Sequence, residues 1–304
     1  MVGLCLALDV GGTKIASGLV TALGELIASE SIGTDVSLDS DDLFDRVAAL
    51  VGRLSSSVPV GEEIAAVGVG CGGPMSAGGA TVSPLNIPAW RSFPLLSRLE
   101  ELVGLPVFID NDAKALALGE GWMGAAMAVR NYMAMVVSTG VGGGIVLDGN
   151  LLDGADGNAG HVGHVIVEPS GRRCGCGAYG CLEAEASGTA IAAITGRRAA
   201  DAGPETIERT GRLVGRAVAS VTSLLGLSLT VVAGSVALGF GEPFFEAANA
   251  ELRSRSRLVY TDGASIVPAG LGASGPLIGA AAVGWRAQGV DVLAPVAAPK
   301  GSSR

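Results

Sequence analysis

Four side chains of the kind that bind zinc occur close together in the middle of the chain. His164 is followed by Cys174, Cys176 and Cys181, and glycines punctuate the segment that carries the cysteines. One imidazole and three thiolates are a common ligand set for structural Zn²⁺. Four protein ligands leave no open coordination position, so such an ion would stabilise the structure without activating water. The segment predicts a structural zinc site, against the alternative of incidental thiols beside a solvent-facing histidine.

A second chemical motif follows the first apolar run. It reads Asp-Val-Gly-Gly-Thr-Lys, from Asp9 to Lys14. Glycines at Gly11 and Gly12 let backbone N–H groups approach an anion closely. Thr13 and Lys14 add a hydroxyl and a cation, and Asp9 could hold a hydrated Mg²⁺. The motif therefore fits a phosphate loop, although Gly-Gly is also ordinary in a tight hairpin turn.

A second glycine-rich loop favours the nucleotide interpretation. Residues 138–144 read Ser-Thr-Gly-Val-Gly-Gly-Gly, and Thr139, Gly140 and Gly142 are the candidate phosphate contacts. So many glycines are costly in chain entropy, so a plain turn rarely carries them. Two such loops predict a nucleotide held between paired domains, which is the arrangement of the actin-like ATPase fold.

The order of apolar runs predicts an α/β fold with largely parallel sheets. Leucines and valines recur at helical spacing over residues 43–54 and 95–102, and another helix starts near Asp112. The predicted strands are residues 4–9, 15–21, 64–71, 107–110, 133–138, 145–147 and 229–233. The second strand–glycine turn–strand unit repeats the first, so we expect two related α/β domains across a cleft.

We expect a smaller N-terminal domain over residues 1–120 and a larger one over 121–292 that carries the zinc loop. The last helix of the chain can pack back on the first domain. The Pro-, Ala- and Ser-rich residues 293–304 are expected to form a mobile tail.

Composition and charge exclude several function classes. The 304 residues carry a net charge of −9 and no run of Lys or Arg, which argues against nucleic acid as a direct partner. Residues 217–241 lack charge but contain four glycines, so they fit a helix end, a turn and a strand better than a membrane span. The clustered cysteines fit a metal site in a reducing compartment, which predicts a cytoplasmic protein.

With these motifs the chain resembles the ROK family of repressors, open reading frames and kinases, which contains bacterial glucokinases and N-acylhexosamine kinases. The resemblance runs from the Asp9–Lys14 motif to residues 271–281. Its most specific part is Ala-Gly-His-Val-Gly-His at 159–164, followed by the cysteines and Leu182-Glu183. It implies an actin-like sugar-kinase fold, ATP-dependent phosphorylation of a hexose or N-acylhexosamine at the 6-hydroxyl, and a homodimer.

The resemblance also implies roles for individual residues. Asp112 matches the catalytic base, and Gly234 and Ser235, with residues 272–279, fall where the family holds adenosine. The matching sugar contacts are Gly73, Asn86, Asn111, Asp112, His164 and Glu183. The sequence itself leaves two alternatives open: Asp112 as a simple helix N-cap, and Asp110 as a rival acid.

One position departs from the glucokinase pattern. His161 stands where family glucokinases usually have Glu, and it is a further candidate sugar contact. A neutral imidazole offers one donor and one acceptor, whereas a carboxylate only accepts. N-acetylmannosamine kinases of the family have His there, so that sugar is a candidate beside glucose.

The resemblance leaves two alternatives to a kinase, a transcriptional repressor and a sugar-binding sensor. A repressor would need a DNA-binding segment ahead of the first phosphate loop, which begins at Asp9. A sugar-binding sensor without catalysis would not need both phosphate loops and Asp112.

Overall fold

The first sheet takes all its strands from the N-terminal part of the chain. The structure, a computed structural model, describes residues 3–294, and only two residues of the predicted tail fall among them. The strands are β1 (Leu4–Val10), β2 (Lys14–Thr21), β3 (Leu26–Gly33), β4 (Ile64–Cys71) and β5 (Val107–Asn111), in the spatial order β3-β2-β1-β4-β5. The strands predicted for this region are confirmed to within one residue at each end.

The helix α1 (Ser40–Ser56) covers part of this sheet, against β2 and β3. The Asp39 carboxylate accepts hydrogen bonds from the N–H groups of Asp41 and Asp42, which fixes where the helix begins. Its buried side chains recur at three- and four-residue steps, as predicted. They are Leu43, Phe44, Val47, Leu50, Val51 and Leu54.

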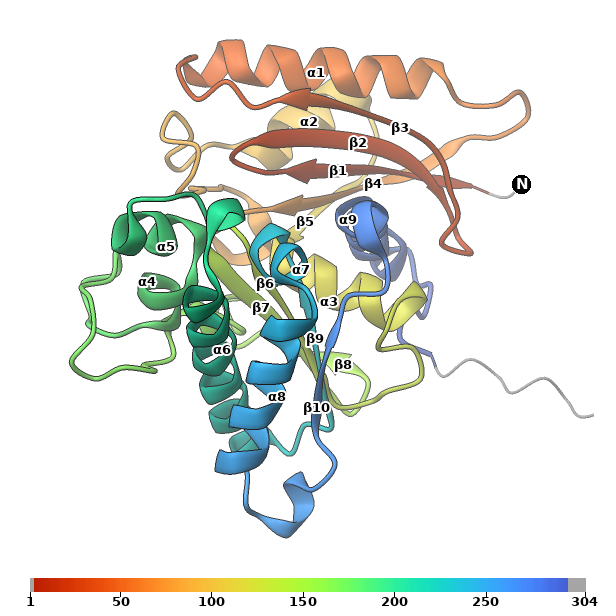
Figure 1. The fold of residues 1–304 in the computed structure, drawn as a ribbon. Coiled ribbons are helices and arrows are strands. Elements are labelled where there is room, and N and C mark those ends of the chain that lie inside the picture. Colours follow the sequence, from red (N-terminus) through yellow and green to blue (C-terminus); the bar gives the residue numbers. More distant parts are fainter. Residues whose placement is uncertain (1–2, 295–304) are drawn as a thin grey trace, which may run out of the picture. The chain divides into compact units, whose positions relative to one another are not determined.

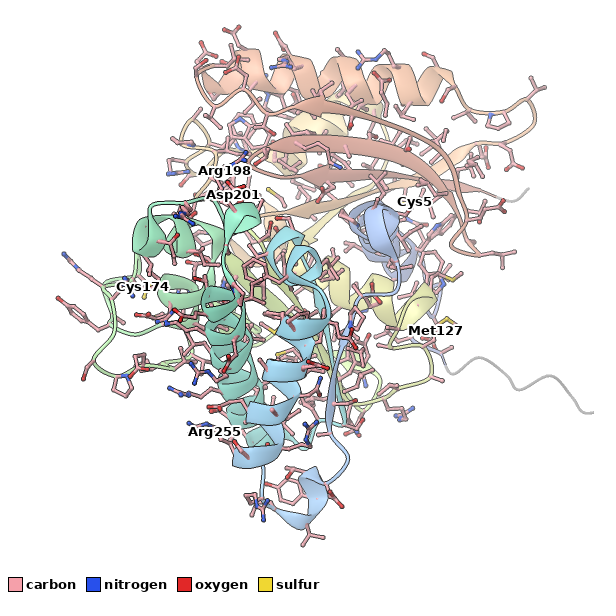
Figure 2. The ribbon with its side chains drawn as sticks, viewed as in Figure 1. Cys5, Met127, Cys174, Arg198, Asp201 and Arg255 are labelled. Atoms are coloured by element: carbon pink, nitrogen blue, oxygen red, sulfur yellow. The ribbon has the colours of Figure 1, made fainter. Side chains whose placement is uncertain are left out.

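The helix α9 (Gly275–Ala287) lies far along the chain yet packs on the first sheet (Figure 1). A Cβ on Gly68 would lie 2.1 Å from the carbonyl oxygen of Ala280. A Cβ on Gly284 would lie 2.6 Å from the sulfur of Cys5, which Figure 2 labels. The Trp285 indole N–H donates to the Val20 carbonyl oxygen at 3.3 Å. One compact unit therefore joins residues 3–130, 148–150 and 273–294.

The second sheet repeats the strand order of the first. Its strands are β6 (Tyr132–Val137), β7 (Val141–Leu147), β8 (Asn150–Leu151), β9 (Leu229–Ala233) and β10 (Ser265–Pro268), in the order β10-β9-β6-β7-β8. Each sheet has an antiparallel hairpin, β1–β2 or β6–β7, whose first strand also pairs in parallel with a later one. The prediction of largely parallel sheets is therefore wrong: both sheets are mixed, because the glycine turns join neighbouring antiparallel strands.

Five α-helices belong to the second unit, which comprises residues 131–147 and 151–272. They are α4 (Leu182–Ala186), α5 (Gly188–Thr195), α6 (Pro204–Leu225), α7 (Ser235–Phe240) and α8 (Glu242–Arg255). Gly211 and Gly215 let α6 pack closely on α8, since a Cβ on either would lie within 2.5 Å of a carbonyl oxygen of α8. The uncharged stretch 217–241 is the end of α6, then β9, then α7. Among the described residues no helix is long and apolar enough to cross a bilayer.

The carboxylate of Glu185 is a buried anchor that the sequence did not reveal. Its side chain is 1% exposed, and Oε1 accepts the backbone N–H of Arg172 at 2.6 Å. Both guanidinium groups of Arg172 and Arg209 also bond to Oε2. The network ties helix α4 to α6 and to the segment before Cys174. Although burial alone would raise the pKa of Glu185, these hydrogen bonds and positive charges lower it overall.

We predict that Glu185→Gln lowers the unfolding free energy by about 3 kcal/mol near pH 7, because it leaves buried donors without a charged partner. A folded-state pKa below the unfolded value means that the contribution is complete above the ordinary pKa of 4.5 and is lost as pH falls through the folded value. Urea unfolding at pH 7 and at low pH measures both effects.

The matched control is Glu208→Gln. Its carboxylate is 4.0 Å from Arg212 in an exposed pair, so the loss should stay below about 0.5 kcal/mol. Equal stability of wild type and Glu185→Gln at pH 7 would contradict the anchoring role.

Candidate functional site

Two hydrogen bonds hold the backbone of the β1–β2 turn. The Gly11 N–H donates to the Lys14 carbonyl oxygen at 3.1 Å, and the Thr34 hydroxyl donates to the Gly11 carbonyl oxygen at 2.7 Å. A Cβ on Gly12 would lie 2.3 Å from the Cβ of Asn86, so glycine is required there. Thr13, Lys14 and Asn86 are exposed beside this turn.

A second loop of the first unit meets this turn. The Leu85 N–H donates to the Gly73 carbonyl oxygen at 3.3 Å, which holds the loop after β4 against the segment that carries Asn86. Because Asn86 also contacts Gly12, the predicted sugar contacts Gly73 and Asn86 lie near the first phosphate turn.

Asp9 and Asp112 crowd the same end of the first sheet. Asp9 pairs with Gly70 across β1 and β4. A Cβ on Gly70 would lie 3.9 Å from Asp9 Oδ1 and 3.7 Å from the Asp112 Cα, so Gly70 lies beside both acids. Burial and then the negative charge of Asp112 raise the pKa of Asp9 to about 7, and Lys14 opposes this shift. Neighbouring carboxylates are suited to a hard divalent cation such as Mg²⁺.

The structure distinguishes Asp112 from its rival. Helix α3 (Asp112–Met123) is capped by Asn111, whose side-chain oxygen accepts the Ala113 N–H at 3.0 Å. The alternative of Asp112 as the N-cap is therefore wrong. Asp110 forms an ion pair of 2.8 Å with the buried Lys114. Asp112 is exposed in the first turn of the helix, where the helix dipole favours an ionised carboxylate.

The second glycine turn is shorter than predicted. It consists of Ser138, Thr139 and Gly140, since β7 already begins at Val141. Gly142 lies within the strand and pairs with Val136, so its prediction as a turn residue is wrong. The neighbouring glycines serve packing as well, because a Cβ on Gly143 would lie 2.8 Å from the Val162 side chain.

Gly234 and Ser235 lie beside this second turn. Gly234 has φ 100°, and a Cβ there would lie 2.3 Å from the carbonyl oxygen of Val137. Only glycine suits this conformation and contact. The hydroxyl of Ser235, at the start of α7, is 3.0 Å from the hydroxyl of Ser138.

The four predicted zinc ligands come together. One ligand atom from each of His164, Cys174, Cys176 and Cys181 lies within 4.8 Å of all the others. The Cys176 and Cys181 sulfurs are 3.7 Å apart, and His164 Nδ1 is 3.7 Å from the Cys174 sulfur. Zn–S bonds of about 2.3 Å in a tetrahedron place two sulfurs ~3.8 Å apart. The residues therefore fit a zinc ion, with Cys176 exposed and Cys174 and Cys181 buried.

Two further predicted sugar contacts lie close to this cluster in the sequence. Helix α4 begins directly after Cys181, and Glu183 stands in its first turn. Glu183 Oε2 accepts the Val141 N–H at 2.9 Å, so the helix contacts the second turn at the start of β7. His161 is exposed, with its ring centroid 6.1 Å from that of His164.

Comparison with known proteins identifies relatives of this chain. The ROK family model matches residues 5–286. A glucokinase of Thermotoga maritima is 40% identical over 61% of this chain, and the match spans only 58% of that relative's length. An N-acetylmannosamine kinase of Escherichia fergusonii is 36% identical over 78% of this chain and 84% of its own.

A solved structure extends the match over the whole fold. The ROK glucokinase of Streptomyces griseus, solved in complex with glucose and AMPPNP, superimposes with a TM-score of 0.80 at 30% identity. The alignment covers 93% of this chain and 100% of that one. With the family model matching almost all of the described residues, the chain belongs to the ROK family.

Proposed function

We propose that this protein is a kinase that transfers the γ-phosphoryl group of ATP to a hexose or N-acylhexosamine, at the 6-hydroxyl. The observation that carries the proposal is the exposed Asp112 at the start of α3, beside the half-buried Asp9 and the β1–β2 glycine turn. Phosphoryl transfer needs positioning and charge neutralisation, together with a carboxylate to receive the hydroxyl proton. The named activities of the two relatives support this class of reaction.

The two acids and the two glycine turns would have different roles in the reaction. Asp112 would orient the sugar hydroxyl and accept its proton as the hydroxyl oxygen bonds to the γ-phosphorus. The bond from that phosphorus to the bridging oxygen breaks, and ADP leaves. Asp9 would hold Mg²⁺, which would supply neutralisation of phosphate charge when bound. The first turn (Gly11, Gly12, Thr13 and Lys14) and the second (Thr139 and Gly140) contact phosphates, whereas Gly234 and Ser235 contact adenosine.

The proposed sugar contacts are the residues that match the family's motif, together with His161. They are Gly73, Asn86, Asn111, Asp112, His161, His164 and Glu183. His164 would bind zinc through Nδ1, the atom that faces Cys174. The ion would thus hold a residue of the sugar site in place, as groups behind a binding site commonly do.

Glucose and N-acetylmannosamine are both candidate substrates. His161 supports the second, because its imidazole cannot accept two hydrogen bonds from vicinal hydroxyls as a carboxylate can. We also propose a cytoplasmic homodimer that does not bind nucleic acid. The free thiols support the cytoplasmic location and the net charge of −9 argues against nucleic acid, whereas the dimer rests on family resemblance alone.

The sensor alternative is the weaker proposal. It shares the sugar contacts but gives no reason for Asp9 and Asp112 to crowd one sheet end despite their repulsion. A sensor would bind sugar without consuming ATP.

We predict that Asp112→Asn lowers kcat by about 10²- to 10⁴-fold while the affinity for sugar changes little, because the amide keeps the shape but cannot accept the proton. A coupled ADP assay and calorimetric sugar binding separate the two effects. Glu242→Gln changes another exposed acid in the first turn of a helix and should leave kcat intact. Full activity of Asp112→Asn would exclude it as the base.

We predict about one zinc ion per chain in purified protein, since four ligands complete one tetrahedral site. Metal analysis should show loss of zinc in Cys174→Ser and a lower melting temperature after chelation. Cys5→Ala removes a buried thiol outside the cluster and should keep the metal. Metal-free protein with unchanged melting behaviour would refute the site.

We predict that His161→Glu raises the kcat/KM ratio of glucose over N-acetylmannosamine about tenfold, because it restores the carboxylate that glucokinases use. Steady-state kinetics with both sugars give the ratio, and His161→Gln controls for loss of the imidazole. An unchanged ratio would mean that His161 does not set sugar preference.

A further inference from the structure

The β6–β7 turn is held from behind by the first residues of helix α5. Gly188 and Thr189 begin this helix, so their N–H groups have no partner inside it. The Gly188 N–H donates to the carbonyl oxygen of Ser138 at 2.7 Å. The Thr189 hydroxyl donates to the carbonyl oxygen of Thr139 at 2.9 Å, and its N–H lies 3.4 Å from the same oxygen. Two successive carbonyls of the turn therefore point toward α5.

The directions of these carbonyl groups determine where the following N–H groups point, because the peptide bond is planar. In a trans peptide the C=O and the following N–H point in opposite directions. Since the Ser138 and Thr139 carbonyls point toward α5, the N–H groups of Thr139 and Gly140 point away from it, next to each other. We call these two N–H groups the amide pair. Adjacent N–H groups aimed the same way form an anion-binding concavity.

The peptide between Gly140 and Val141 does not add a free N–H group to the concavity. The Gly140 carbonyl oxygen accepts the Ser138 N–H at 2.9 Å, and the following N–H, that of Val141, donates to Glu183. A Cβ on Gly140 would lie 2.8 Å from Glu183 Oε2, so a larger residue there would displace this carboxylate. An anion is therefore limited to the amide pair, because a carboxylate already holds the third N–H.

We propose that Thr189 is a positioning residue that aims the amide pair at the phosphate groups of ATP; this rests on the proposed kinase function. At 3.4 Å the backbone N–H of Thr189 is a weak donor, so the hydroxyl supplies the main bond to the Thr139 carbonyl. The Thr189 side chain is exposed, so this bond and not core packing is its main contribution. Removing the hydroxyl frees the peptide between Thr139 and Gly140 to rotate.

The test compares Thr189→Val, Thr189→Ala and Thr189→Ser with wild type. Val and Ala remove the donor, and Ser restores it in the smallest form. We expect the KM for Mg-ATP and the calorimetric Kd for AMPPNP to rise about fivefold in Val and Ala, the effect of one lost hydrogen bond. Ser should bind as wild type does. The KM for sugar and the Kd for adenosine should not change, because neither ligand carries a phosphate for the amide pair.

Each other outcome is informative. Unchanged AMPPNP affinity in both Val and Ala would overturn the proposal, and so would an equal loss for adenosine, which indicates general disturbance of the second unit. Failure of Ser to restore affinity would also overturn it. If wild type binds no AMPPNP, the proposed kinase function fails as well, so the two failures are distinguishable.

Discussion

The repulsion between Asp9 and Asp112 is the constraint on which the first unit's site depends. Parallel pairing of β1 with β4 and of β4 with β5 brings the ends of these strands to one sheet edge, where both carboxylates lie. Burial and mutual charge raise the pKa of Asp9 to about 7, a cost to the folded chain without a cation. The proposed function gives both acids a role: Asp9 would bind a divalent cation, and Asp112 would receive the proton of the phosphoryl acceptor.

The second unit depends on a different constraint, the fixing of a short glycine turn from outside. Helices α4 and α5 provide the supports, through Glu183 and Thr189. Helix α4 begins at the last cysteine of the cluster, and the Glu185 network ties its far end to α6. An ion bound by the four ligands would therefore hold the start of the segment that supports the turn. The zinc cluster and the phosphate turn are connected through a few residues of one chain segment.

Much of this could be predicted from the sequence because it is local. Apolar runs gave the strands, the acidic start at Asp39 gave α1, and the metal ligands followed from spacing. Alternating strands and helices suggested parallel sheets, whereas β1–β2, β2–β3 and β6–β7 are antiparallel neighbours joined by short turns, so the parallel character of the sheets was predicted wrongly. Gly142 was assigned to a turn because glycine content does not distinguish a turn from a strand that other backbone approaches closely.

Some site features left a signal that was not used. Asp110 and Lys114 have the spacing of a helical ion pair, which would have removed Asp110 as a candidate base. Glu185 and Thr189 left no comparable signal, because their partners lie on segments that only the folded chain brings near.

The most direct test of the account is ATP consumption by the purified wild-type protein with glucose, mannose, N-acetylglucosamine and N-acetylmannosamine. The account predicts sugar-dependent ADP formation with at least glucose or N-acetylmannosamine, and none without sugar. Calorimetric binding of one of these sugars with no ADP formed from any of them would contradict it and leave a sugar sensor.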